Sequence, residues 1–290
     1  MIRLILMFFV VFGLCVSHLF AQEEKIQIIF RGDDMGALHS VNEACIQSYR
    51  EGIMRSVEVM VPTPWFQEAV KMLNAHPELD VGVHLTLTSE WERIKWGPVS
   101  PAPSLTDAFG NFLPMTSQRR DFPPNTGFLQ SGYDLKEVEQ ELRAQIELAK
   151  KHIQNLTHLT SHMNTPTSTP QLQEIVEKLA QEFDLPLELP VEVKRFQPYD
   201  WRASAEEKIK GMIKALQTAE PGLYLYVDHP GLDTAEMRAV GHIGYEDVAE
   251  DRAGVTRVLT DAKVWEIIRQ RDIQLLSYGD VIREYRKKQK

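Results

Sequence analysis

The chain has 290 residues, of which 43% are hydrophobic and 25% are charged, and its net charge is −9 at pH 7. This composition is that of an ordinary globular protein with enough apolar material for a sizeable core. The only basic block is the tail at residues 286–290, which is typical of a solvated helix end. The charge balance therefore argues against a nucleic acid as partner.

Residues 1–21 have the pattern of a secretory signal peptide. Arg3 is followed by a short, almost wholly apolar run, and Ala21 precedes a polar stretch. A basic start, a short apolar run and a small residue before the cleavage point are typical of such signals. We therefore expect a secreted or periplasmic protein whose mature part, residues 22–290, is a single domain without stable membrane insertion. An uncleaved membrane anchor and a lipid anchor at Cys15 are the alternatives.

Short apolar runs alternate with longer amphipathic runs along the mature part of the chain. Strands are predicted at residues 26–30, 57–61, 81–87, 156–160, 187–189, 223–227 and 273–276. Helices are predicted at residues 41–50, from 63 onward, 134–151, from 169 onward and 263–269. Repeated strand–helix units indicate an α/β fold with seven or eight mainly parallel strands. That number is enough for a distorted (β/α) TIM-like barrel, and an open doubly wound sheet is the alternative.

Residues 91–132 interrupt this alternation. The segment holds six prolines and several aromatic residues, and it has no sustained hydrophobic period. Irregular segments of this length in compact domains are usually functional or disordered. We predict a Pro-rich lid or loop.

Polar residues of the kinds that bind metals or transfer protons lie at or near the ends of four of the predicted strands. Asp33 and Asp34 end the first strand, His84 lies within the third, His162 follows the fourth, and His229 follows the sixth. These side chains converge in space only if the strands are parallel in one sheet or barrel, where chemistry gathers at the carboxyl ends.

Asp34, His84 and His162 match the set of two histidines and one carboxylate that leaves coordination positions open on a divalent metal ion. Adjacent strand residues point to opposite sides, so Asp33 could accept a proton while Asp34 binds the metal. His229 could protonate a leaving group, since the pKa of histidine, ~6.5, suits acid catalysis near neutrality. Taken singly, each residue has a structural alternative: a helix cap for the aspartate, a core or turn residue for each histidine.

Four segments share the residue order of the motifs of a known family: residues 32–36, 84–88, 161–162 and 227–231. They resemble the YdjC/ChbG-like carbohydrate deacetylases, whose motifs are an Asp-Asp pair before Gly, a His-x-Thr-Leu-Thr segment, a Ser-His segment and a His-Pro-Gly segment. The agreement in order and spacing covers nearly all of the mature chain.

The resemblance implies a distorted barrel with one divalent metal ion. The residue types leave zinc, manganese, iron, cobalt, nickel and magnesium open, and of these we expect zinc or magnesium. The resemblance also implies that Asp34, His84 and His162 are the metal ligands, that Asp33 is the general base and that His229 is the general acid. The implied reaction is hydrolysis of an N-acetyl group on an amino sugar or a short oligosaccharide.

The third motif departs from the family pattern. The family has Asp-Ser-His-x-His, whereas this chain has Thr160 in place of the Asp and Asn164 in place of the last His. This difference, the long Pro-rich segment and the predicted export indicate a divergent, secreted subgroup. Within the segment, Trp91 and Trp96 could stack on sugar faces or pack the segment itself.

Two other functions remain open from the sequence. One is a metal-dependent hydrolase of another bond, such as a phosphoester or a different amide. The other is a glycan-binding protein that has lost catalysis. The sequence also leaves open whether the chain forms a homo-oligomer.

Overall fold

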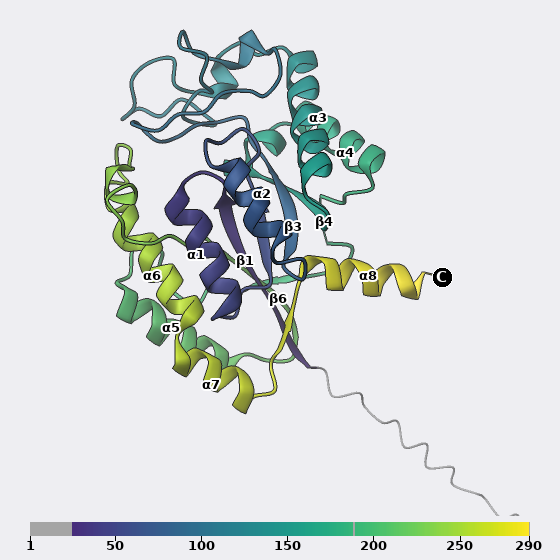
Figure 1. Cartoon of the computed structure of the whole chain (residues 1–290), viewed down its shortest axis with the longest axis vertical. Helices are drawn as coiled ribbons and strands as arrows, with labels where there is room; N and C mark the ends of the chain where they lie inside the picture. The colour runs from purple at the N-terminus through teal and green to yellow at the C-terminus, as the bar shows by residue number, and fades with distance from the viewer. Residues whose placement is uncertain (1–24, 188, 290) are drawn as a thin grey trace, which may run out of the picture.

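The computed structural model describes residues 25–187 and 189–289, and a sheet of seven strands lies at its centre (Figure 1). The predicted signal peptide at residues 1–21 lies outside the described residues. The strands are β1 (Ile26–Met35), β2 (Ser56–Val59), β3 (Asp80–Leu85), β4 (Leu156–Ser161), β5 (Lys194–Arg195), β6 (Gly222–Asp228) and β7 (Gln274–Leu276).

All strand pairs are parallel, and the strands follow the order β4-β3-β2-β1-β6-β5. The long strand β1 pairs with β7 at residues 27–29 and with β2 at residues 31–35. Within the described part of the chain no ladder joins β4 to β5, so the sheet is a curled half-barrel. The predicted α/β fold with seven or eight mainly parallel strands is confirmed in this form.

Eight α-helices and four short 3-10 turns surround the described sheet. The helices are α1 (His39–Arg50), α2 (Phe66–Asn74), α3 (Leu135–His152), α4 (Pro170–Phe183), α5 (Ala205–Thr218), α6 (Val248–Thr260), α7 (Ala262–Gln270) and α8 (Tyr278–Lys288). The 3-10 turns are η1 (Pro103–Leu105), η2 (Phe128–Gln130), η3 (His162–Thr167) and η4 (Met237–Ala239). Across residues 25–187 and 189–289, no helix has both the length and the apolar character needed to cross a bilayer.

The two faces of the sheet differ in character. On the outer face, side chains such as Val57 and Val83 pack with α1 to α4 in the largest apolar cluster, and Phe30 packs with α5 to α7 in a second one. Because side chains alternate between faces, the residues next to these valines point inward. The inner face has a small apolar cluster around Ile29 and, beside it, a row of buried polar side chains that includes Glu58.

Two sequence-based predictions of element position were wrong. The helix expected from Thr63-Pro64 begins at Phe66, because the Thr63 hydroxyl donates to the Met60 carbonyl and the chain makes an extra turn first. The strand expected at residues 187–189 is absent at Leu187 and Leu189, and β5 lies at Lys194–Arg195 instead. The flanking prolines at 186 and 190 have no N–H to give to a ladder.

The segment at residues 91–132 is irregular, as predicted, and it is packed against the fold. It lies beyond the carboxyl ends of the strands, beside α3 (Figure 1). Trp91 and Trp96 are only 2% and 3% exposed, so both rings pack the segment and are not free to stack on a sugar. The buried Glu141 carboxylate of α3 accepts the backbone N–H groups of Val99 and Ser100. These contacts fix the segment beside the sheet.

Candidate active site

Asp33 and Asp34 lie at the end of β1, where the backbone is irregular. The register with β2 shifts between Gly32 and Met35, and Asp34 has a φ of 70°, in the left-handed region. As a result both carboxylates face the same histidine: His84 Nε2 lies 3.7 Å from Asp33 Oδ2 and 3.7 Å from Asp34 Oδ1. The expectation that the two side chains point to opposite sides was therefore wrong, because regular strand alternation does not hold across this bulge.

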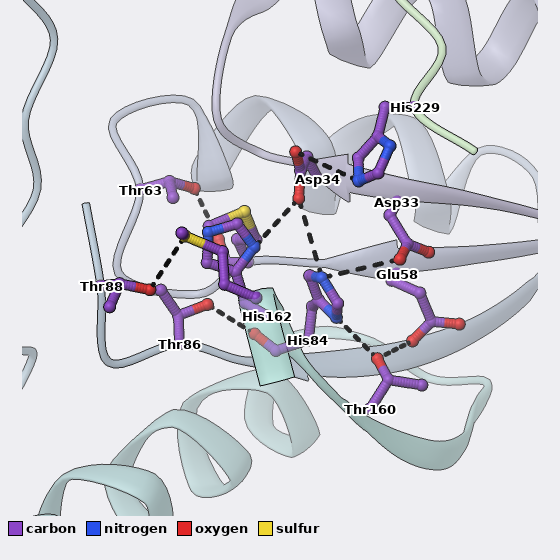
Figure 2. A network of polar contacts seen from close by, with 12 residues as sticks. Asp33, Asp34, Glu58, Thr63, His84, Thr86, Thr88, Thr160, His162 and His229 are labelled. Carbon is purple, nitrogen blue, oxygen red and sulfur yellow. Dashed lines mark hydrogen bonds and ion pairs between the residues drawn. The ribbon is translucent and has the colours of Figure 1, made fainter. Parts of the chain in front are cut away.

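The three predicted metal ligands come together in the structure. One ligand atom each from Asp34, His84 and His162 lies within 4.8 Å of the others, and all three residues are buried. His162 Nδ1 is 3.2 Å from Asp34 Oδ1, and the two imidazole rings meet edge to face with centroids 5.2 Å apart (Figure 2). The carboxyl ends of β1, β3 and β4 thus bring two imidazole nitrogens and one carboxylate oxygen together at one position.

Only one of the two Asp34 carboxylate oxygens has a hydrogen-bond partner among the described residues. Asp34 Oδ2 accepts a hydrogen bond of 2.8 Å from the Arg252 guanidinium on α6. Asp34 Oδ1 is buried and has no hydrogen-bond partner among the described residues. A buried oxygen without a partner is costly unless another ligand satisfies it. A divalent cation between Oδ1 and the two histidines would do so, and two imidazoles with one carboxylate fit such an ion.

Each histidine is held from behind by a polar group. His84 Nδ1 lies 2.8 Å from Thr160 Oγ1, and His162 Nε2 lies 3.0 Å from Glu90 Oε2. Histidines that bind a metal through one ring nitrogen commonly use the other in this way. The outer contacts thus leave His84 Nε2 and His162 Nδ1 facing Asp34.

Burial and neighbouring charges shift the pKa values of the three proposed ligands. Burial alone would raise the pKa of Asp34, but Arg252, His229 and His162 hold that pKa well below its usual value. Burial lowers the pKa of His84 to about 4. Burial would also lower the pKa of His162, but the carboxylates of Glu90 and Asp34 raise it to about 10. Without a cation, a proton on His162 balances these two carboxylates.

Asp33 is clamped by the arginine two residues before it. Arg31 Nε donates to Asp33 Oδ1 at 2.8 Å, and a terminal nitrogen of Arg31 donates to Oδ2 at 2.9 Å. The remaining Arg31 nitrogen donates to the Tyr278 hydroxyl at 2.9 Å. This bidentate pair fixes the Asp33 carboxylate beside the three-residue group.

His229 lies on the open side of the site. Its Nε2 is 4.0 Å from Asp34 Oδ2, and 42% of its side chain is exposed, compared with 3% for that of His84. The Asp228 carboxylate accepts the backbone N–H of His229 at 2.9 Å and lies 3.7 Å from its Nδ1. The hydroxyls of Tyr199 and Tyr226 donate to the other Asp228 oxygen at 3.0 and 3.1 Å.

The surroundings favour a charged His229. Partial burial would lower the pKa of His229, but the negative charge of Asp34 and the contact with Asp228 raise it above the usual value for histidine. A protonated imidazole at this position is able to donate a proton to a bound molecule.

The structure adds residues that sequence reasoning did not single out. Arg252 and Glu90 touch predicted ligands directly, and each lies far in sequence from the ligand that it touches, so no local pattern marks them. The Arg252 guanidinium also lies 5.2 Å from the centroid of the Trp91 ring, which covers it. Arg31 is the exception, because it stands two positions before Asp33 in the same strand and strand alternation places both on one face.

Comparison with known proteins identifies the family. The family described as YdjC-like protein matches residues 27–270. A carbohydrate deacetylase of Brevibacillus brevis is 28% identical over 276 residues, which cover 88% of this chain and 100% of that protein. A carbohydrate deacetylase of Vibrio cholerae is 26% identical over 271 residues, which cover 89% of this chain and 97% of that protein.

A solved structure agrees with these matches. A protein of Enterococcus faecalis, described as a cellobiose-phosphate cleavage protein, superposes with a TM-score of 0.69 at 25% identity and covers 88% of this chain and 98% of its own. The chain belongs to the YdjC-like protein family, and the resemblance inferred from the sequence motifs is confirmed.

Proposed function

We propose that this member of the YdjC-like family is a metal-dependent carbohydrate deacetylase that hydrolyses the N-acetyl group of an amino sugar or a short oligosaccharide. The observation that carries the proposal is the buried group of Asp34, His84 and His162, with ligand atoms within 4.8 Å and a carboxylate oxygen that has no partner among the described residues. Relatives that align over 97–100% of their own length are carbohydrate deacetylases, which supports the substrate class.

Asp34, His84 and His162 would hold one divalent metal ion. When bound, such an ion polarises a carbonyl oxygen and lowers the pKa of water toward ~7. Zinc suits a site with two imidazole ligands better than magnesium, which prefers oxygen ligands. Arg252 keeps Asp34 Oδ2 engaged, so the carboxylate presents its Oδ1 toward the histidines.

Asp33 is the proposed general base. It accepts the proton of the water whose oxygen bonds to the acetyl carbon, and its two hydrogen bonds to Arg31 hold the carboxylate in place during that transfer.

His229 is the proposed general acid. As the bond between the acetyl carbon and the sugar nitrogen breaks, the imidazolium donates a proton to that nitrogen, which leaves as the amine. The products are acetate and the free amino sugar. The exposure of His229 suits this role, because the sugar must reach it from solvent, and Asp228 orients its ring.

The test is a screen for acetate release from acetylated amino sugars and oligosaccharides, with zinc, magnesium or a chelator added. We expect acetate from at least one substrate, about one metal ion per chain, and loss of both in His84→Ala. The matched control is His152→Ala, since His152 is an exposed helix residue. Equal metal content in the wild type and His84→Ala would contradict the ligand assignment.

The Enterococcus faecalis neighbour favours one second candidate, cleavage of a phosphorylated sugar. The same screen therefore includes sugar phosphates and measures inorganic phosphate. Phosphate release without acetate release would replace the first proposal by the second. Saturable sugar binding without either product would favour a glycan-binding protein that lacks catalysis.

We also infer that the mature protein acts outside the cytoplasm, on the basis of the signal-peptide pattern at residues 1–21. Expression of the full chain in a bacterial host should give a product in the periplasm or medium whose amino terminus is Gln22. A cytoplasmic product that starts at Met1 would contradict export.

A further inference from the structure

A row of buried polar side chains lies behind His84 on the inner face of the sheet. The strand register puts Glu58 of β2 beside Gly82 of β3, and Gly82 beside His158 of β4. Two positions further along, His84 of β3 lies beside Thr160 of β4. Because alternate residues share a face, these five positions form two adjoining rows that end at the proposed metal ligand.

The hydrogen bonds of Thr160 fix which nitrogen of His84 carries a proton. The Thr160 hydroxyl donates to Glu58 Oε2 at 2.6 Å (Figure 2). A hydroxyl has one hydrogen, so the Thr160 oxygen must accept from His84 Nδ1, which lies 2.8 Å away. With its hydrogen on Nδ1, the neutral His84 ring has a free lone pair on Nε2, the nitrogen that faces Asp34.

Glu58 is itself held in one orientation. Its Oε1 lies 2.7 Å from His158 Nε2, and both residues are at most 1% exposed. On the other side of that ring, Thr157 donates its hydroxyl to Asp80 at 2.7 Å, so it accepts from His158 Nδ1, also at 2.7 Å. Both nitrogens of His158 therefore act as donors, which makes it a buried cation that binds the Glu58 carboxylate.

Gly82 leaves the space that this arrangement needs. A Cβ atom at Gly82 would lie 2.2 Å from Glu58 Oε2 and 2.5 Å from His158 Nε2. Any larger residue there would push the Glu58–His158 pair away from Thr160. A glycine at position 82, in the middle of β3, is thus required for Glu58 and His158 to pair next to Thr160.

We propose that Glu58, acting through the Thr160 hydroxyl, is the carboxylate that orients His84 and fixes its tautomer for metal binding. Glu58 and Thr160 are positioning residues, and the inference rests on the proposed metal site. Glu58 lies on β2, next to the strand of His84, and it reaches His84 only through the hydroxyl of Thr160, so these three residues form a hydroxyl relay. Thr160 is one of the two positions at which the third motif departs from the family pattern, so this relay is a feature of the chain's own variant of the motif.

The first test compares two substitutions at one position. Thr160→Val keeps the shape and the strand propensity but removes the hydroxyl, whereas Thr160→Ser keeps the hydroxyl. The affinity of purified protein for Zn²⁺ is measured by competition with a chelator, which needs no substrate. We expect Thr160→Val to bind Zn²⁺ about 10–100-fold more weakly, as for other residues that support metal-binding histidines, and Thr160→Ser to bind it like the wild type. Equal affinities for all three proteins would overturn the inference.

The second test needs no variant, so it decides even if Thr160→Val fails to fold. Nitrogen NMR of the histidine side chains in the wild-type protein, with and without Zn²⁺, shows which ring nitrogen of His84 carries the proton. We expect the Nδ1–H form in both states, and the Nε2–H form in the metal-free protein would overturn the inference. A wild type that binds no Zn²⁺ but shows Nδ1–H would instead count against the proposed metal site alone.

Discussion

The histidines on the two sides of the site differ in burial. On one side His84 and His162 are buried, and each contacts Asp34 at the front and another polar side chain behind. On the other side His229 is 42% exposed, and its contacts with the carboxylates of Asp34 and Asp228 are long, at 4.0 and 3.7 Å. Groups that bind a metal gain from being fixed before binding, whereas a proton donor must stay within reach of a substrate that arrives from solvent. The contrast in burial therefore matches a division between metal binding and proton transfer.

The largest expected effect concerns the residue that lies between the two sides. Asp33→Asn removes the proposed base but keeps the shape of the side chain, so acetate release should fall by about 10²–10⁴-fold. Metal content should stay at the wild-type level, because Asp33 is not among the proposed ligands. The measurements are kcat on the best substrate and metal per chain. Acetate release at the wild-type rate would show that Asp33 is not the base.

His229→Gln tests the exposed side. Because the glutamine cannot donate an acidic proton, we expect kcat to fall by about 10²-fold or more while metal content stays unchanged. Asp228→Asn leaves the imidazole in place and only loosens its orientation, so its effect on kcat should be smaller. A loss of metal in His229→Gln would place this histidine among the ligands and remove the contrast between the two sides.

Arg252→Met tests the buried side through stability. The substitution leaves the Asp34 carboxylate buried without its cationic partner, and breaking a buried ion pair in this way costs about 3–5 kcal/mol. The free energy of unfolding of metal-free protein should fall by this order. Addition of Zn²⁺ should restore more stability to the variant than to the wild type, because the metal supplies the missing positive charge. Identical stabilisation of the two proteins by Zn²⁺ would contradict this account.

The smallest effect is a pH dependence of stability from the buried Glu58–His158 pair. Burial alone would raise the pKa of Glu58, but His158 and Arg31 lower it from 4.5 to about 2, so its contribution is present above pH 4.5 and is lost as the pH falls toward 2. Burial would lower the pKa of His158, but Glu58 and Asp80 raise it above 6.5. The contribution of His158 to stability is therefore complete below pH 6.5 and is lost as the pH rises through the raised pKa. The positive charge of Arg31 opposes the rise of the His158 pKa, and the Tyr278 ring stacks on the imidazole.

The pair should thus stabilise the fold most between about pH 4.5 and 6.5. The measurement is the free energy of unfolding in urea across pH 3–9 for the wild type and His158→Gln. The difference between the two proteins should be greatest inside that window. A difference that does not change with pH would show that His158 is not charged in the folded protein.

The sequence predicted the parallel sheet and the convergence of the site residues because both follow from short-range patterns. Runs such as that at residues 26–30 alternate with amphipathic helices, and parallel strands bring their carboxyl ends together whatever the details of the loops. The same argument located Asp34, His84 and His162 near one another without any knowledge of distances.

The sequence did not predict the details that depend on distant contacts. The bulge that turns Asp34 toward the same side as Asp33 depends on a left-handed backbone that aspartate adopts only in some contexts. Glu58 stands between two valines and looks like a solvated position in a half-exposed strand, yet it is fully buried by partners from other strands. Arg252 lies 218 positions after the carboxylate it binds, and a single sequence gives no sign of that pairing.

The contacts that anchor residues 91–132 affect local unfolding of the chain. An irregular segment of this length is usually the first place where a protease cuts, because its backbone separates easily from the rest. Here Glu141 binds two of its amide groups, and the side chain of Trp96, within the segment, is buried. The part of the segment that Glu141 binds should therefore exchange its hydrogens together with α3, with the amides of Val99 and Ser100 as slow as those of the helix. This part of the irregular segment is then expected to be as rigid as the helix that supports it.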